Sequence, residues 1–220
     1  MSQNELCESY PLWKRVLFSD LMLSKSKAQK IAYVGVLAAL NIVANMFLEV
    51  KFFDTQFSVT IFLALLTGLL IGPLFGFAAV FLGDFVGYVC NSWGYLYMPW
   101  VGLSSATFAL LAGLIVNGVR IGGKGGIYLK LAIVCVLSFF VCTVAINSTG
   151  FYFYNKAAGF STAIIDYVAS QFGGDVTYFG YVCYRLLFKG QIFNSLFNYA
   201  LIFAAVPLLN AVRPLRLNIR

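Results

Sequence analysis

Long apolar runs, separated by short polar or glycine-containing breaks, set the pattern of this chain. A helix needs about 20 predominantly apolar residues to cross the hydrocarbon core of a membrane. Runs of this kind predict membrane-spanning helices near residues 29–48, 57–71, 73–90, 99–118, 127–146 and 191–212. The expected fold class is an all-α integral membrane protein with six transmembrane helices.

The second and third runs form one apolar stretch, from Phe57 to Cys90, which is too long for a single span. Gly72 and Pro73 divide it, because proline ends one helix and suits the first turn of the next. The second helix is therefore short, and we expect it to be tilted or partly recessed.

The composition supports this class and argues against several kinds of site. Hydrophobic residues make up 61% of the chain and charged residues 10%, whereas a soluble protein is about half apolar and a quarter charged. There is no histidine, and the five cysteines include no C-x-x-C pair. We therefore expect no zinc site, no histidine-based catalytic triad, and no metal or cofactor.

The basic residues are distributed unevenly between the two sides of the predicted bundle. Eleven lie in the N-terminal segment, the loop between the fourth and fifth helices, and the tail: Lys14, Arg15, Lys25, Lys27, Lys30, Arg120, Lys124, Lys130, Arg213, Arg216 and Arg220. Four lie on the other side: Lys51, Lys156, Arg185 and Lys189. Because positive residues are retained on the cytoplasmic side, we predict that both termini are cytoplasmic. The net charge of +7 thus indicates topology rather than a nucleic-acid partner.

The N-terminal segment has an amphipathic pattern. Its apolar residues at helical spacing are Leu12, Trp13, Val16, Leu17 and Leu21. This pattern is typical of a helix that lies in the membrane interface, with a docking role as the alternative. We divide the chain into a cytoplasmic or interfacial segment (1–28), a six-helix substrate-binding domain (29–212) and a basic cytoplasmic tail (213–220).

Aromatic side chains are concentrated in the segments predicted to lie on the outer side, which are 49–56, 91–98 and the long connection 147–191. The densest group is Trp93, Tyr95, Tyr97 and Trp100, and amides lie nearby at Asn91, Asn147, Asn194 and Asn198. Such rings can form an ordinary interfacial belt. Their mixture with amides favours a binding site for a flat heteroaromatic ligand.

Asp84 is an acid within the third apolar run, with no basic residue between Lys51 and Arg120. A charge at the bilayer centre costs about 2.5–3.5 kcal/mol on insertion scales, so such residues usually face the bundle interior. Asp84 would stand about 16 Å along the helix from Pro73, below the aromatic loop. It could take a proton, bond to a substrate nitrogen, or hold its helix to a neighbour. An aspartyl enzyme is not expected, because no predicted span holds a second acid.

Small residues form a stripe on the first predicted helix, at Ala32, Gly35 and Ala39. Similar stripes run through the third and fourth helices. Such stripes allow helices to approach closely. On the first helix, the stripe serves either packing inside the bundle or the docking of a partner subunit.

The stretches "FSVTIFLALLTGLLIGPLFGFAAVFLGDFVGYV" and "YMPWVGLSSATFALLAGLI" resemble the substrate-binding S component of energy-coupling factor (ECF) vitamin transporters. The resemblance covers about residues 29–120 and returns at "RLLFKGQIFNSLFNYAL". Arg185 is similar to a basic position of folate-type members, which implies an anionic, folate-like ligand. The long aromatic connection departs from the pattern.

The resemblance implies a subunit that captures a vitamin and, with a transmembrane coupling subunit and two ATPases, takes it up across the plasma membrane of a prokaryote. It implies no enzymatic activity of its own. The candidate ligand residues are Asp84, Asn91, Trp93, Tyr95, Tyr97, Trp100, Asn147, Arg185, Asn194 and Asn198, and the candidate docking residues are Ala32, Gly35 and Ala39. The alternative is an autonomous proton-coupled carrier or channel that uses Asp84.

Overall fold

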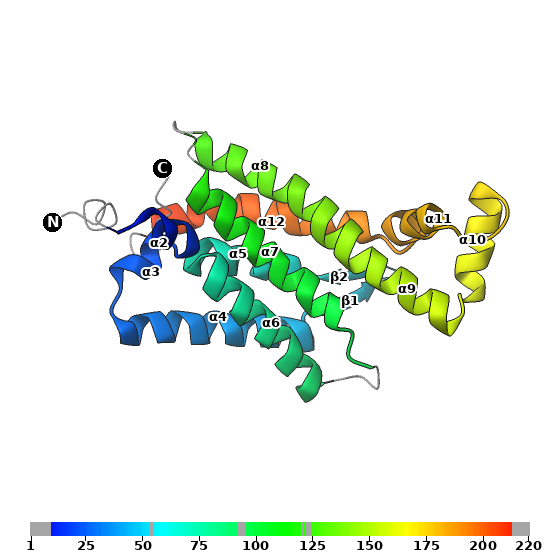
Figure 1. Ribbon diagram of the computed structural model, residues 1–220, viewed down its shortest axis with the longest axis horizontal. Coiled ribbons are helices and arrows are strands. Elements are labelled where there is room, and N and C mark those ends of the chain that lie inside the picture. The colour runs from blue at the N-terminus through cyan, green and yellow to red at the C-terminus, as the bar shows by residue number, and fades with distance from the viewer. Residues whose placement is uncertain (1–9, 53–54, 92–95, 120, 122–124, 213–220) are drawn as a thin grey trace.

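The computed structural model describes residues 10–52, 55–91, 96–119, 121 and 125–212. Figure 1 shows an elongated bundle in which most helices follow the long axis. Its elements are α2 (Leu12–Leu17), α3 (Asp20–Ser24), α4 (Lys27–Phe47), β1 (Glu49–Phe52), β2 (Thr55–Ser58), α5 (Thr60–Ile71), α6 (Pro73–Cys90), α7 (Pro99–Gly118), α8 (Gly126–Ser138), η1 (Phe139–Ser148), α9 (Thr149–Ala158), α10 (Thr162–Phe172), α11 (Tyr178–Cys183), η2 (Tyr184–Phe188) and α12 (Gln191–Ala211).

Five helical stretches of the described chain are long and apolar enough to cross a membrane: Lys27–Phe47, Pro73–Cys90, Pro99–Gly118, Gly126–Ala158 and Gln191–Leu209. The sixth predicted helix is α5, whose 12 residues reach about 18 Å against a hydrocarbon core of about 30 Å. The all-α membrane fold is therefore confirmed, with a second helix that is short as predicted.

A small hairpin of two antiparallel strands precedes α5, and the sequence pattern did not predict it. Strands β1 and β2 pair from Glu49 with Ser58 to Phe52 with Thr55. The second helix consequently begins at Thr60 rather than at residue 57.

The fifth span is longer than predicted. Elements α8, η1 and α9 form one continuous helix of 33 residues, Gly126–Ala158, which is about 50 Å long. The predicted span 127–146 matches the part that a bilayer can cover, and the helix continues beyond it. The connection from 147 to 191 is thus mostly helical, and Figure 1 places α10 and α11 at the end of the bundle opposite α2 and α3.

The break between α5 and α6 is built around Gly72, which has a φ of +85° that favours glycine. A Cβ atom there would lie 2.7 Å from the backbone nitrogen of Ser19, so the N-terminal segment packs directly on the break. The Ser19 hydroxyl donates a hydrogen bond to the Leu70 carbonyl at 2.5 Å. The N-terminal segment is helical as predicted, with Trp13 exposed and Met22 buried.

The small-residue stripes on α6 and α7 lie at helix contacts inside the bundle. A Cβ atom at Gly68 would collide with the Ala109 carbonyl, and one at Gly113 would collide with Pro73. These contacts place α7 against α5 and the start of α6. The largest buried apolar cluster lies around them, between α5, α7, α8 and α12.

Candidate functional site

Arg185 lies on η2 and is buried, with only 8% of its surface exposed. Its guanidinium carbon lies 4.1 Å from the centroid of the Phe151 ring. One guanidinium nitrogen donates to the Asn147 carbonyl at 3.2 Å, and the side chain also hydrogen-bonds Tyr181. The structure thus brings Asn147 and Arg185 together, 38 residues apart in sequence.

The charge of Arg185 has no carboxylate partner within the part of the chain that the structure describes. Burial lowers the pKa of its guanidinium to about 10, while Tyr181 and Tyr184 oppose that shift. The side chain is therefore protonated at neutral pH. A buried charge without a counterion is costly, so a ligand group that accepts hydrogen bonds would stabilise this site.

Trp100, in the first turn of α7, also contacts Phe151. Its ring centroid lies 5.8 Å from that of Phe151 and 6.0 Å from that of Tyr154. A Cβ atom at Gly150 would collide with the indole, so only glycine allows this close approach. Trp100 and Arg185 therefore both contact the Phe151 ring.

Two buried polar atoms of this cluster have no hydrogen-bond partner among the described residues: Nε1 of Trp100, a donor, and Oδ1 of Asn147, an acceptor. Buried polar groups are nearly always satisfied in native proteins, and leaving one unpaired costs about 1–3 kcal/mol. The cluster therefore combines a buried donor, a buried acceptor, a buried cation and an aromatic ring. Groups of these kinds suit a planar ligand with a polar edge.

Helices α9, α10, α11 and η2, residues 149–188, form an aromatic layer that includes Phe151 and Arg185. We call it the outer cap, after the predicted topology. Its buried residues are Ile164, Val168, Tyr181 and Tyr184. Tyr152 contacts Phe160, Tyr178 and Tyr181 at centroid distances of 5.8, 5.3 and 5.6 Å. The aromatic connection noted in the sequence is thus a packed structure, and it holds Arg185 away from water.

Asp84 is also buried, at 8% exposure, on α6. The Tyr97 hydroxyl donates to its Oδ2 atom at 3.3 Å. Both groups lie against Gly102 of α7, where a Cβ atom would be 2.6 Å from Oδ2 and 2.8 Å from the Tyr97 oxygen. The Tyr97 ring also contacts Phe85 and Tyr88. The contact between Asp84 and Tyr97 therefore joins α6 to the start of α7, and Tyr97 lies three residues before Trp100 in the chain.

The Asp84–Tyr97 contact predicts a specific response to alkaline pH. Burial, and then the charge of Asp84, raise the pKa of Tyr97 from 10.0 to about 12. The folded chain thus favours the protonated phenol, and this contribution to stability is present below pH 10 and is lost as the pH rises toward 12. Comparison with Tyr97→Phe identifies the part of the tyrosinate absorbance that comes from Tyr97. We expect this part to titrate near pH 12 in the parent and at lower pH in Asp84→Asn. Identical titrations in the two proteins would show that Asp84 does not act on Tyr97.

Asn194 and Asn198 lie together on α12, but their amides are bonded to the backbone where β2 leads into α5. Asn194 Oδ1 accepts from the Ser58 amide at 2.9 Å, and Asn198 Oδ1 accepts from the Phe62 amide at 2.8 Å. Asn198 Nδ2 donates to the Ser58 carbonyl at 2.7 Å. These bonds satisfy backbone groups that a helix start leaves unpaired. A ligand contact from either amide would have to replace one of them.

The remaining predicted site residues are dispersed. Asn91 donates to the Met46 carbonyl at 3.4 Å and ties α6 to α4. Trp93 and Tyr95 lie outside the described residues. Phe151 and Tyr181 were absent from the predicted site, although the spacing of Phe151, four residues after Asn147, would have placed the two on one helix face.

The stripe Ala32, Gly35 and Ala39 is exposed along α4. A Cβ atom at Gly35 would meet no atom within 4 Å. The stripe is therefore not used for packing within the described chain, and its role as a docking face stays a prediction.

Comparison with known proteins gives one family. The sequence matches the family described as "ECF-type riboflavin transporter, S component" over residues 25–190, which is 166 of the 220 residues. A search of curated proteins finds no match. The members of this family are binding subunits of transporters rather than enzymes. The matched range includes α4 to α9, the outer cap and Arg185, and the chain belongs to the ECF-type riboflavin transporter S component family as a membrane-embedded, substrate-binding subunit.

Proposed function

We propose that this subunit captures riboflavin or a closely related flavin at the cluster formed by Trp100, Asn147, Phe151 and Arg185. The observation that carries the proposal is the buried guanidinium of Arg185, which stacks on Phe151 and has no carboxylate partner in the described chain. The family description supports the flavin, and the cluster has the chemistry to bind one.

A flavin ring is flat and carries carbonyl oxygens and one imide N–H along a polar edge. Arg185 would donate to a carbonyl oxygen, and the free Oδ1 atom of Asn147 would accept from the imide. Trp100 and Phe151 offer faces and edges for aromatic contact. Asn147 Oδ1 would then gain a donor, and Trp100 Nε1 would bond to a second acceptor of the ligand.

A second candidate is an anionic, folate-like vitamin, and the charge of Arg185 favours it. A guanidinium can bind a carboxylate through two parallel hydrogen bonds, which are stronger than bonds between neutral groups. A flavin would offer Arg185 only one carbonyl oxygen as a hydrogen-bond acceptor. The two candidates therefore differ in how strongly binding depends on the charge at residue 185.

The exposed stripe on α4 supports a partner-dependent mode of transport. S components associate with a membrane coupling subunit and ATPases in ECF transporters. We infer the same assembly here, with two ATPases and with Ala32, Gly35 and Ala39 as the docking face, in the plasma membrane of a prokaryote. An autonomous carrier would use Asp84 as a proton relay, whereas Asp84 lies against Tyr97 and Gly102 at a helix contact.

The deciding experiment is to purify the chain from cells grown in rich medium and identify the co-purified small molecule by mass spectrometry. Riboflavin is expected. Tryptophan fluorescence of the ligand-free chain then measures affinity. Trp100→Phe should remove more of the ligand-induced quenching than Trp13→Phe, because Trp13 belongs to α2, at the end of the bundle opposite α10 and α11 (Figure 1). Folate in place of riboflavin would establish the second candidate. Quenching that depends only on Trp13 would contradict the proposed site.

The same preparation separates the two modes of transport. Liposomes that contain this chain alone, under a pH gradient, should show no riboflavin uptake above empty liposomes. Uptake that is lost in Asp84→Asn would instead establish the autonomous carrier.

A further inference from the structure

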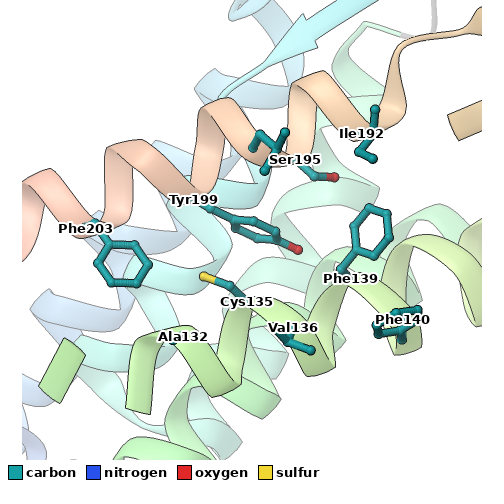
Figure 2. Close-up of a pocket in the computed structure, with 10 residues that line it drawn as sticks. Ala132, Cys135, Val136, Phe139, Phe140, Ile192, Ser195, Tyr199 and Phe203 are labelled. Atoms are coloured by element: carbon teal, nitrogen blue, oxygen red, sulfur yellow. The ribbon is translucent and has the colours of Figure 1, made fainter. Parts of the chain in front are cut away.

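A groove lies between the fifth and last spans, away from the Arg185 cluster. One wall is formed by α8 and η1, with Ala132, Val136 and Phe140, and the other by α12, with Leu196, Tyr199 and Phe203. Its volume is about 400 Å³. Figure 2 shows the two helices facing each other across it, with the Tyr199 ring directed from α12 toward Cys135.

The groove lies at the depth of the hydrocarbon core. Ala132 and Phe140 are about 9 and 21 Å along the helix from Gly126, within a core of about 30 Å. Val136, Phe140 and Leu196 are each more than half exposed. Since both walls belong to helices that can cross a membrane, these side chains continue the lipid-contacting surface directly into the groove.

The surface of the groove is entirely apolar. The Ser195 hydroxyl is in the wall, but its oxygen is buried and does not reach that surface. Water would find no hydrogen-bond partners there. A vitamin would leave its polar groups unpaired. The chemistry of the groove therefore selects a hydrocarbon.

The size of the groove suits a single chain. Its walls run from Ala132 to Phe140, about 12 Å along the helix, and its volume is about 400 Å³. An acyl chain of the bilayer can reach this space directly, because Val136, Phe140 and Leu196 are exposed beside it. One extended acyl chain is therefore the occupant that the position and the chemistry of the groove favour.

We propose that this groove is a binding site for one acyl chain of a membrane phospholipid. The acyl chain would fill the space between α8 and α12 and would support α12. Asn194 and Asn198 of α12 bond to the backbone at the start of α5. This site is separate from the vitamin site and does not depend on which vitamin is bound.

Ala132→Phe tests the site, because a phenyl ring on the wall would occupy part of the groove. The matched control is Ala78→Phe, at an exposed alanine on α6 at a similar distance from the inner end of its helix. The protein is purified in detergent with added phosphatidylcholine, and retained lipid is measured by native mass spectrometry. We expect the parent and the control each to retain one lipid. In Ala132→Phe the retained lipid should fall by about tenfold, because the ring would displace about two buried methylene groups of the acyl chain. Equal retention in all three proteins would overturn the proposal.

A second measurement does not depend on how Ala132→Phe folds. A tryptophan is introduced at Phe140 in the groove, where it replaces another aromatic side chain, or at Leu82 on the exposed side of α6. The chain's own tryptophans are replaced by phenylalanine. Both should be quenched by phosphatidylcholine with brominated acyl chains in a bilayer. After dilution into detergent, quenching should persist for Phe140→Trp and be lost for Leu82→Trp. Equal loss at both positions would show ordinary surrounding lipid and contradict a specific site.

Discussion

Replacing Arg185 with glutamine is expected to lower the affinity for the vitamin by about 10- to 100-fold. A hydrogen bond to a charged group contributes about 1.5–3 kcal/mol, and each 1.4 kcal/mol changes an affinity tenfold. The cause is the loss of a buried donor that has no other charged partner within the described residues. Arg185→Lys should recover part of the affinity for an anionic vitamin, and less for a flavin, because lysine keeps the charge but not the planar donor pair.

The stability of the unliganded protein distinguishes this role from a structural one. Arg185→Gln leaves no unpaired carboxylate behind, and it removes a buried charge that is costly to keep. The melting temperature of the empty chain should therefore change little, while the stabilisation by ligand should fall. Lys156→Gln, which removes an exposed positive charge from α9, is the control for the general effect of charge. Equal loss of affinity in both variants, or a loss of folding without a loss of affinity, would contradict a direct contact from Arg185.

The overall fold was predictable because the bilayer imposes a length on apolar segments. The break at Gly72-Pro73 was predictable for the same reason, because the apolar run from Phe57 to Cys90 is too long for one membrane span. The extent of the fifth helix was not predictable on this basis. Beyond residue 146 the chain continues as α9 with amphipathic composition, and nothing in a hydropathy pattern shows that a helix extends past the membrane.

The candidate site was only partly predictable, because its geometry depends on contacts distant in sequence. Arg185, Asn147 and Trp100 were expected at the predicted outer end. The structure brings Arg185 and Trp100 to the Phe151 ring and bonds Arg185 to the Asn147 carbonyl. Phe151 is one of 22 phenylalanines, and its spacing from Asn147 was the one local signal for it. Asn194 and Asn198 were predicted as ligand residues from sequence, and that role stays a prediction. In the structure their amides bond to backbone groups 136 to 140 residues away.

Asp84 illustrates why a residue type alone does not define a role. The sequence left three roles open, and the contact with Tyr97 and Gly102 supports the third, the joining of neighbouring helices. Trp100 lies three residues after Tyr97, in the first turn of α7. We therefore expect the Asp84–Tyr97 contact to influence where the indole meets Phe151. We expect Asp84 to affect ligand binding through the position of Trp100.

Replacing Gly35 with leucine is expected to abolish vitamin uptake while leaving the vitamin affinity of the isolated chain unchanged. A leucine side chain at this position would meet no atom of the described chain within 4 Å at its Cβ. The replacement also removes a glycine from the interior of a helix, and this removal should stabilise the helix by up to about 1 kcal/mol. The bundle should therefore fold normally. A partner helix that approaches the stripe closely would be held away by the new side chain.

Uptake of labelled riboflavin by cells that contain the whole transporter, together with co-purification of the coupling subunit, measures this effect. Ala78→Leu provides the matched control, because Ala78 is an exposed small residue on a different span. We expect the control to transport normally and to retain its partner. If Gly35→Leu transports normally, or if it loses vitamin binding as well as uptake, the α4 stripe is not the docking face. Selective loss of uptake would show that capture of the vitamin and its delivery use different faces of the subunit, since Gly35 lies on α4 and Arg185 lies in the outer cap.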